Sequence, residues 1–225
     1  MSMWNVMALA VAAAVVLAEP GPAVAGPASE ELFRADVLDG IAAKTEIGYA
    51  HDRMVLRTEG LRPVEGGTAM VVLGTADDGI RAAQVRMGSG EALRVVGTFP
   101  ASSGNPLLPI MLESSARAMS TITGGSPFYI RNRMKEALAA ADQVNDITIE
   151  VGGAEVAARE IILRPFLNDA KRDRMGNFAE MTLRFVMAEA ATGGFVLFEA
   201  DTPPAADGIV AYRETFMLHD TRMGE

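Results

Sequence analysis

The stretch GNPLLPIMLESSARAMSTITGGSPFYIRNRMKEALAAAD, residues 104–142, decides the fold of this chain. Apolar residues recur through it every three or four positions, which is the spacing of an amphipathic helix. Gly124 and Gly125 interrupt the pattern, and Ser126 and Pro127 then supply a cap and a first-turn proline for a second helix. The stretch therefore predicts a hairpin of two helices.

Each predicted helix has an apolar face and a polar face. Asn105 and Pro106 suit the start of the first helix, and Glu113 and Arg117 are spaced to pair across one turn of its wet side. The apolar face of the first helix consists of Leu108, Met111, Leu112, Ser115, Met119 and Ile122. The apolar face of the second helix consists of Ile130, Met134, Ala137, Leu138 and Ala141.

Segments of alternating apolar and polar residues lie on both sides of the hairpin, at 44–99 and 144–218. A period of two indicates half-buried strands, and we expect roughly nine of them, the clearest over 178–187. Glycine-rich and Asp-rich turns separate the segments and are too short for crossover helices, so neighbouring strands should be antiparallel. A short helix is predicted ahead of them, over 27–43, with Phe33 on its packed face.

The fold predicted from these elements is α+β and mainly antiparallel β. It is a curved sheet or open half-barrel, with the two-helix hairpin inserted at 105–142 and packed on one face, because one face of such a sheet must be covered. Residues 26–225 are expected to form a single domain. In its order of elements the chain resembles the bacterial lipoprotein carrier fold, which implies a carrier function, but no motif of that family carries a site residue over.

The N-terminus has the features of a secretory signal peptide. Residues 6–18 are an unbroken apolar run, and Ala23-Val-Ala25 is a small-residue cleavage site, which predicts a signal peptide over 1–25 and a mature chain starting at Gly26. The run is shorter than the roughly 20 residues that span a bilayer, so no transmembrane anchor is expected in the mature chain. No Lys or Arg precedes the run, which leaves a disordered or buried apolar N-terminal helix as the alternative. The predicted location is secreted, in the periplasm.

Charge and cysteine content exclude several classes of function. The formal net charge of -9 disfavours nucleic acid as a partner, since that binding needs clustered Lys and Arg. The chain has no cysteine, which rules out disulfides, thiolate metal sites and a thiol nucleophile. The sequence implies no cofactor and no metal. His51 and His219 lack spaced carboxylate partners, so a hydrolase that uses one of them with a carboxylate from across the sheet is only an alternative.

The hypothesis that remains is a non-enzymatic envelope protein, a carrier or scaffold for an apolar small molecule or lipid. Flexible thioethers tolerate varied apolar shapes, so the space beneath the hairpin is the predicted ligand site. Its predicted lining consists of Met111, Leu112, Met119, Phe128 and Met134. The alternative is an accessory protein that binds an envelope protein partner through a basic helix face at Arg131 and Lys135.

Overall fold

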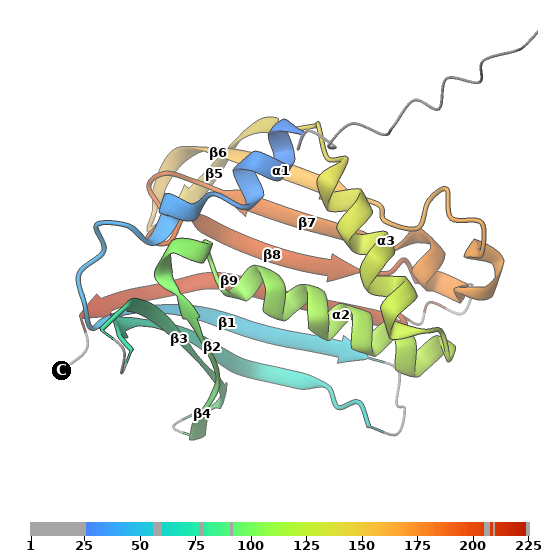
Figure 1. Ribbon diagram of the computed structural model, residues 1–225, viewed down its shortest axis with the longest axis horizontal. Helices are drawn as coiled ribbons and strands as arrows, with labels where there is room; N and C mark the ends of the chain where they lie inside the picture. Colours follow the sequence, from blue (N-terminus) through green and yellow to red (C-terminus); the bar gives the residue numbers. More distant parts are fainter. Residues whose placement is uncertain are drawn as a thin grey trace, which may run out of the picture.

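The computed structural model describes residues 26–55, 60–76, 79–90, 92–204, 208 and 210–223. Within these residues nine strands form one antiparallel sheet, and three α-helices lie on one side of it (Figure 1). The strands are β1 Thr45–Val55, β2 Val64–Thr75, β3 Arg81–Ser89, β4 Ala92–Pro100, β5 Asn145–Val151, β6 Ala154–Leu163, β7 Thr182–Met187, β8 Phe195–Asp201 and β9 Tyr212–Met223. The helices are α1 Pro27–Leu32, α2 Leu107–Thr123 and α3 Pro127–Ala139.

The order of strands in the sheet is β4-β3-β2-β1-β9-β8-β7-β6-β5. Strands β1 to β4 form one meander and β5 to β9 form another, and the hairpin of α2 and α3 carries the chain from one outer edge to the other. The first and last strands, β1 and β9, therefore pair in the middle of the sheet. The sheet stays open, as the sequence predicted, and the fold class and inserted hairpin are confirmed.

The face of the sheet beneath the helices is apolar because each strand alternates inward and outward side chains. On β1 the inward side chains include Ile47, Tyr49 and Val55, which are buried together with the inward residues of α2 and α3 in one hydrophobic core. Gly124 ends α2 in the left-handed conformation, with φ of 70°, as its place in the sequence predicted.

A buried asparagine fixes the start of α2 against the sheet. The Asn105 side chain accepts a hydrogen bond from the backbone N–H of Leu107 at 3.1 Å. Its amide nitrogen donates to the Tyr49 hydroxyl at 3.2 Å and to the Gly193 carbonyl at 3.1 Å. The same residue therefore caps the helix and joins it to β1 and to the turn before β8.

Two segments differ from the sequence predictions. The helix expected over 27–43 begins at Pro27 but is broken into α1 and a 3-10 turn, Ala35–Leu38, and Phe33 between them is 49% exposed, so its predicted packing was wrong. The strand expected from residue 178 begins at Thr182, because Gly176–Glu180 forms a 3-10 turn that buries Phe178 in the core. Regular alternation does not distinguish such a turn from a strand end.

The signal peptide predicted over 1–25 lies outside the described residues. In the part of the chain that the structure describes, no helix is long and apolar enough to cross a membrane.

Candidate functional site

An open cavity of about 510 Å³ lies between α2 and the strands β1, β3 and β4, and is called the cleft below. Most of its wall is apolar, and these side chains are only partly buried. Val96 is 52% exposed, and Phe99 and Ile110 pack on the edge of the core. The apolar residues of the wall are Met87, Val96, Phe99, Pro109 and Ile110.

Irregularities in β4 place two of these side chains in the cleft. The pairing of β3 with β4 shifts register between Val85 and Arg86, so that Val96 has no partner and forms a bulge. Gly97 follows the bulge, and a Cβ atom there would come within 2.8 Å of the Phe99 ring. The glycine thus lets this ring fold back along the strand and line the cleft.

The inner end of the cleft is polar. His51 and Arg53 enter it from β1, Glu214 from β9 and Ser114 from α2. The His51 Nε2 atom lies 2.8 Å from Glu214 Oε1, and the two side chains are almost fully buried. The His51 ring also stacks on Phe216, with ring centroids 4.3 Å apart. Its sequence neighbour Asp52 faces away and accepts a hydrogen bond from the Gly66 N–H at 2.8 Å.

Glu214 is held as a carboxylate by its neighbours. Burial would raise its pKa, but hydrogen bonds from His51, Ser114 and Tyr212 and the charge of Arg53 outweigh burial and lower the pKa overall. The Tyr212 hydroxyl donates to Glu214 Oε2 and is 3.3 Å from the buried Ser115 hydroxyl. Burial, followed by the Glu214 charge, raises the pKa of Tyr212. The carboxylate therefore has donors for both of its oxygens.

Arg53 is the least satisfied group of the cleft. Its Nη1 atom donates to the Ser114 hydroxyl at 3.2 Å and lies 3.7 Å from Glu214 Oε1. Its Nε atom is buried and has no hydrogen-bond partner among the described residues. A buried donor without an acceptor is costly, so this N–H has capacity for one more contact.

Ion pairs between the two helices form the rim of the cleft. Arg131 of α3 holds Glu113 of α2 through two hydrogen bonds of 2.7 Å, and Arg117 adds a third at 2.6 Å. The hydrogen bond from Arg131 is the main reason that the pKa of Glu113 falls to about 2, with a further contribution from Arg117. The predicted pairing of Glu113 with Arg117 is present, and Arg131 joins it.

The residues predicted to bind a ligand are not brought together at the cleft. Met111, Met119 and Met134 are fully buried in the core, and Leu112 packs against it. Met119 also backs a separate cavity of about 350 Å³ beside the turn between α2 and α3. Phe128 is 75% exposed and lies beside Arg131, whose guanidinium is 5.7 Å from the ring centroid.

The two residues predicted to bind a partner occupy different surroundings. Arg131 is engaged by Glu113, whereas Lys135 is exposed. The hairpin therefore offers one available cation at these two positions. Sequence reasoning missed the cleft residues Arg53 and Glu214, although both are charged residues at inward positions of alternating strands. A charged residue at an inward position of a strand was the sequence signal that could have pointed to the cleft.

The two histidines have different environments. His219 is exposed near the end of β9. His51 has the carboxylate partner from a neighbouring strand that the hydrolase hypothesis required, but its Nε2 atom faces that carboxylate. The Ser114 hydroxyl bonds to Arg53 and Glu214, and no hydrogen bond among the described residues joins it to His51. The part of the chain that the structure describes also contains no group of three His, Asp or Glu side chains able to hold a metal ion.

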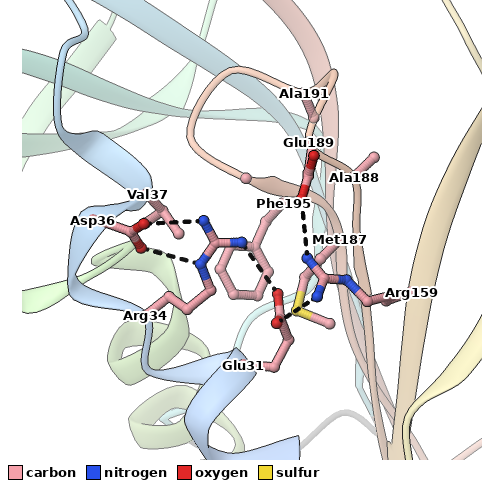
Figure 2. Close-up of a pocket in the computed structure, with 11 residues that line it drawn as sticks. Glu31, Arg34, Asp36, Val37, Arg159, Met187, Ala188, Glu189, Ala191 and Phe195 are labelled. Atoms are coloured by element: carbon pink, nitrogen blue, oxygen red, sulfur yellow. Dashed lines mark hydrogen bonds and ion pairs between the residues drawn. The ribbon is translucent and has the colours of Figure 1, made fainter.

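Another cavity, of about 360 Å³, is lined by charged side chains that pair with one another (Figure 2). Arg34 pairs with Asp36 at 3.0 Å and with Glu31 at 3.5 Å. Arg159 pairs with the other side of Glu31 at 2.8 Å and with Glu189 at 3.8 Å. This chain of ion pairs ties the N-terminal segment to β6 and the turn before β8, which is a structural role.

Comparisons with known proteins identify no relative by sequence. No protein-family model matches the chain, and no curated protein does. Among solved structures, the lipoprotein LppX of Mycobacterium tuberculosis is similar over 84% of this chain and 90% of its own, with 9% sequence identity and a TM-score of 0.35. At that level of likeness the comparison carries no argument about function.

Proposed function

We propose that this protein is a non-enzymatic carrier that holds an apolar or amphiphilic small molecule in the cleft between α2 and the strands β1, β3 and β4. The observation that supports the proposal most is the cleft itself: a largely apolar wall, open to solvent, that ends at a buried polar cluster. The envelope location predicted from residues 1–25 belongs to the same proposal.

The size and lining of the cleft suit a small ligand. Its volume of about 510 Å³ falls within the roughly 300–1,000 Å³ of small-molecule sites, which are mostly apolar with a few placed polar groups. Apolar side chains such as Val96 and Ile110 remain partly in contact with water. Covering them with an alkyl chain would gain about 25 cal/mol for each Å² of apolar surface removed from water.

The polar end supports binding more than catalysis. A serine hydrolase needs a hydroxyl within hydrogen-bonding reach of the histidine that takes its proton. Here His51 and the Ser114 hydroxyl both donate hydrogen bonds to Glu214, which holds the cluster in one arrangement. A charged cluster held in one arrangement can orient a bound ligand without reacting with it.

The direct test is to fill the cleft. Ile110 lies on the wall, so Ile110→Trp should occupy much of the space, whereas Thr121→Trp places the same side chain on the exposed side of α2. The probe is N-phenyl-1-naphthylamine, a neutral apolar dye whose fluorescence rises on burial. We expect the unmodified chain and Thr121→Trp to bind the dye alike, and Ile110→Trp to bind it at least tenfold more weakly.

Two results would contradict the proposal. One is failure of the unmodified, folded chain to bind the dye or any alkyl-chain competitor. The other is equal binding by Ile110→Trp and Thr121→Trp, which would place the dye elsewhere on the molecule. Circular dichroism of each variant verifies that the fold is retained.

A further inference from the structure

We propose that the molecule held in the cleft is a single-chain amphiphile with an acidic head group, a carboxylate or a phosphate, and that Arg53 binds this head group. The inference rests on the proposed carrier function and specifies its ligand. The evidence for it is the set of hydrogen-bond donors and charged side chains at the polar end of the cleft.

Arg53, at the polar end of the cleft, has hydrogen-bond donors that no neighbouring side chain uses. A guanidinium has five N–H donors, and the contacts of Arg53 with Ser114 and Glu214 involve only Nη1. The buried Nε atom has no acceptor among the described residues. Arginine binds carboxylates and phosphates through paired N–H groups, and Arg53 lines the cleft, so an acidic head group there can accept from the N–H groups that Ser114 and Glu214 leave free.

The neighbouring carboxylate does not compete for a cationic head group. Glu214 already receives hydrogen bonds from His51, Ser114 and Tyr212, and it is 99% buried. At the inner end of the cleft a cation or an amine would face the guanidinium of Arg53, because the carboxylate of Glu214 is covered. The polar end therefore selects against positive charge.

The balance of charge around the cleft also favours an anion. The charges that line it or pair directly at its rim are three arginines, Arg53, Arg117 and Arg131, and two glutamates, Glu113 and Glu214. Three positive charges against two negative ones leave a surplus of one positive charge, on a chain whose net charge is -9. The lining itself carries two arginines and two glutamates, and the surplus positive charge comes from Arg131 at the rim.

The volume of the cleft suits one chain. At about 510 Å³ the space is near the middle of the roughly 300–1,000 Å³ range for small ligands. The apolar wall runs along Met87, Phe99 and Ile110, and the arginine lies where that wall ends. An alkyl chain on the wall would place its head group at Arg53.

The test compares head groups on one chain length. Dodecanoate, dodecyl phosphate, dodecanol and dodecyltrimethylammonium each compete with N-phenyl-1-naphthylamine for the full chain, below their micelle concentrations. We expect both acids to displace the dye at concentrations roughly tenfold or more below that of dodecanol, which is the size of one hydrogen bond to a charged group. The cation should be the weakest competitor.

Arginine variants then locate the preference. In Arg53→Gln, the acids should lose their advantage over dodecanol. Arg53→Lys keeps a positive charge beside Glu214 but lacks the Nε–H, so it should fold and lose most of the preference. The matched control is Arg213→Gln: Arg213 is exposed on β9 and pairs with Asp201, away from the cleft. It should keep the full preference.

The outcomes separate the two proposals. If dodecanol competes as well as dodecanoate, or if Arg53→Lys keeps the full preference for acids, the head-group inference is wrong while the carrier proposal stands. If none of the four compounds competes and the dye does not bind, both proposals fail. If only one of the two acids gains from Arg53, that result identifies which acidic head group the cleft accepts.

Discussion

The two halves of the sheet, one on each side of the β1–β9 pair, differ in the side chains that fill the space beneath the helices. Under the hairpin, β7, β8 and β9 present Phe185, Phe198 and Phe216, and these rings leave almost no exposed surface. Phe198 stacks on Phe195 and meets the edges of Tyr49 and Phe185. We call this the aromatic half. The cleft half, at β1, β3 and β4, presents Met87, Val96 and Phe99, which remain partly in contact with water.

Two adjacent faces of α2 account for this difference. Its Met111 and Ser115 complete the aromatic core, while Ile110 and Ser114, each one residue earlier, face the cleft. A single helix therefore seals one half and leaves an open cleft over the other. Stability should depend on the first half and binding on the second.

The largest expected effect comes from one phenylalanine in each half. Phe198→Ala removes a fully buried ring and should cost roughly 3–5 kcal/mol of unfolding free energy. Phe99→Ala removes a partly exposed ring and should cost about 1 kcal/mol, a common value for point mutations, yet weaken dye binding. Chemical denaturation measures both costs. An equal loss of unfolding free energy in the two variants would contradict the distinction between the halves.

A second experiment tests the cluster at the boundary of the two halves. Glu214→Gln should lower the free energy of unfolding at pH 7 by roughly 1.5–3 kcal/mol, which is the usual value of a hydrogen bond with a charged partner. In the unmodified chain the charged partner is the Glu214 carboxylate. Its folded pKa is lowered from an ordinary 4.5, so the stabilisation is present above that value and is lost as the pH falls below it through the folded pKa.

The pH dependence of unfolding checks this sign. Below pH 4.5 the unmodified chain should lose stability more steeply than Glu214→Gln. The control is Glu189→Gln, because the Glu189 side chain is 86% exposed. A slope in Glu214→Gln as steep as that of the unmodified chain would mean that this carboxylate does not stabilise the fold.

The smallest expected effect lies at the rim. Arg131→Gln removes the main partner of Glu113 and should lower the melting temperature only slightly, as is usual for an exposed ion pair. Lys135→Gln, one turn further along α3, should leave the melting temperature unchanged. A larger loss from Lys135→Gln than from Arg131→Gln would contradict the assignment of Arg131 as the bridge between the helices.

The fold could be predicted from the sequence because its signals are local. The spacing of Ile130, Met134 and Leu138 indicates a helix in any surroundings, and Gly124 ends the preceding helix through its own backbone. The inward alternation of Ile47, Tyr49 and His51 is equally local, and it is present in β1. These patterns were enough for the α+β class, the open sheet and the hairpin.

The cleft could not be predicted in the same way because it depends on the order of strands in the sheet. Arg53 and Glu214 are far apart in the chain and meet only because β1 pairs with β9. The bulge at Val96 depends on the register of β4 against β3. An apolar residue on a helix is typical of core packing and of a ligand site alike, so Met111 and Met134 looked like lining residues although they are core residues.

The most direct test of the account is to map where an amphiphile binds. A dodecanoate analogue with a diazirine at the end of its chain, irradiated with the full chain and analysed by peptide mass spectrometry, labels the residues that it touches. If the amphiphile binds in the cleft, label is expected within 87–99 and 109–117, and it should be lost in Ile110→Trp. Label concentrated on β7 and β8, or on residues 128–135 of α3, would contradict the claim that the cleft is the binding site.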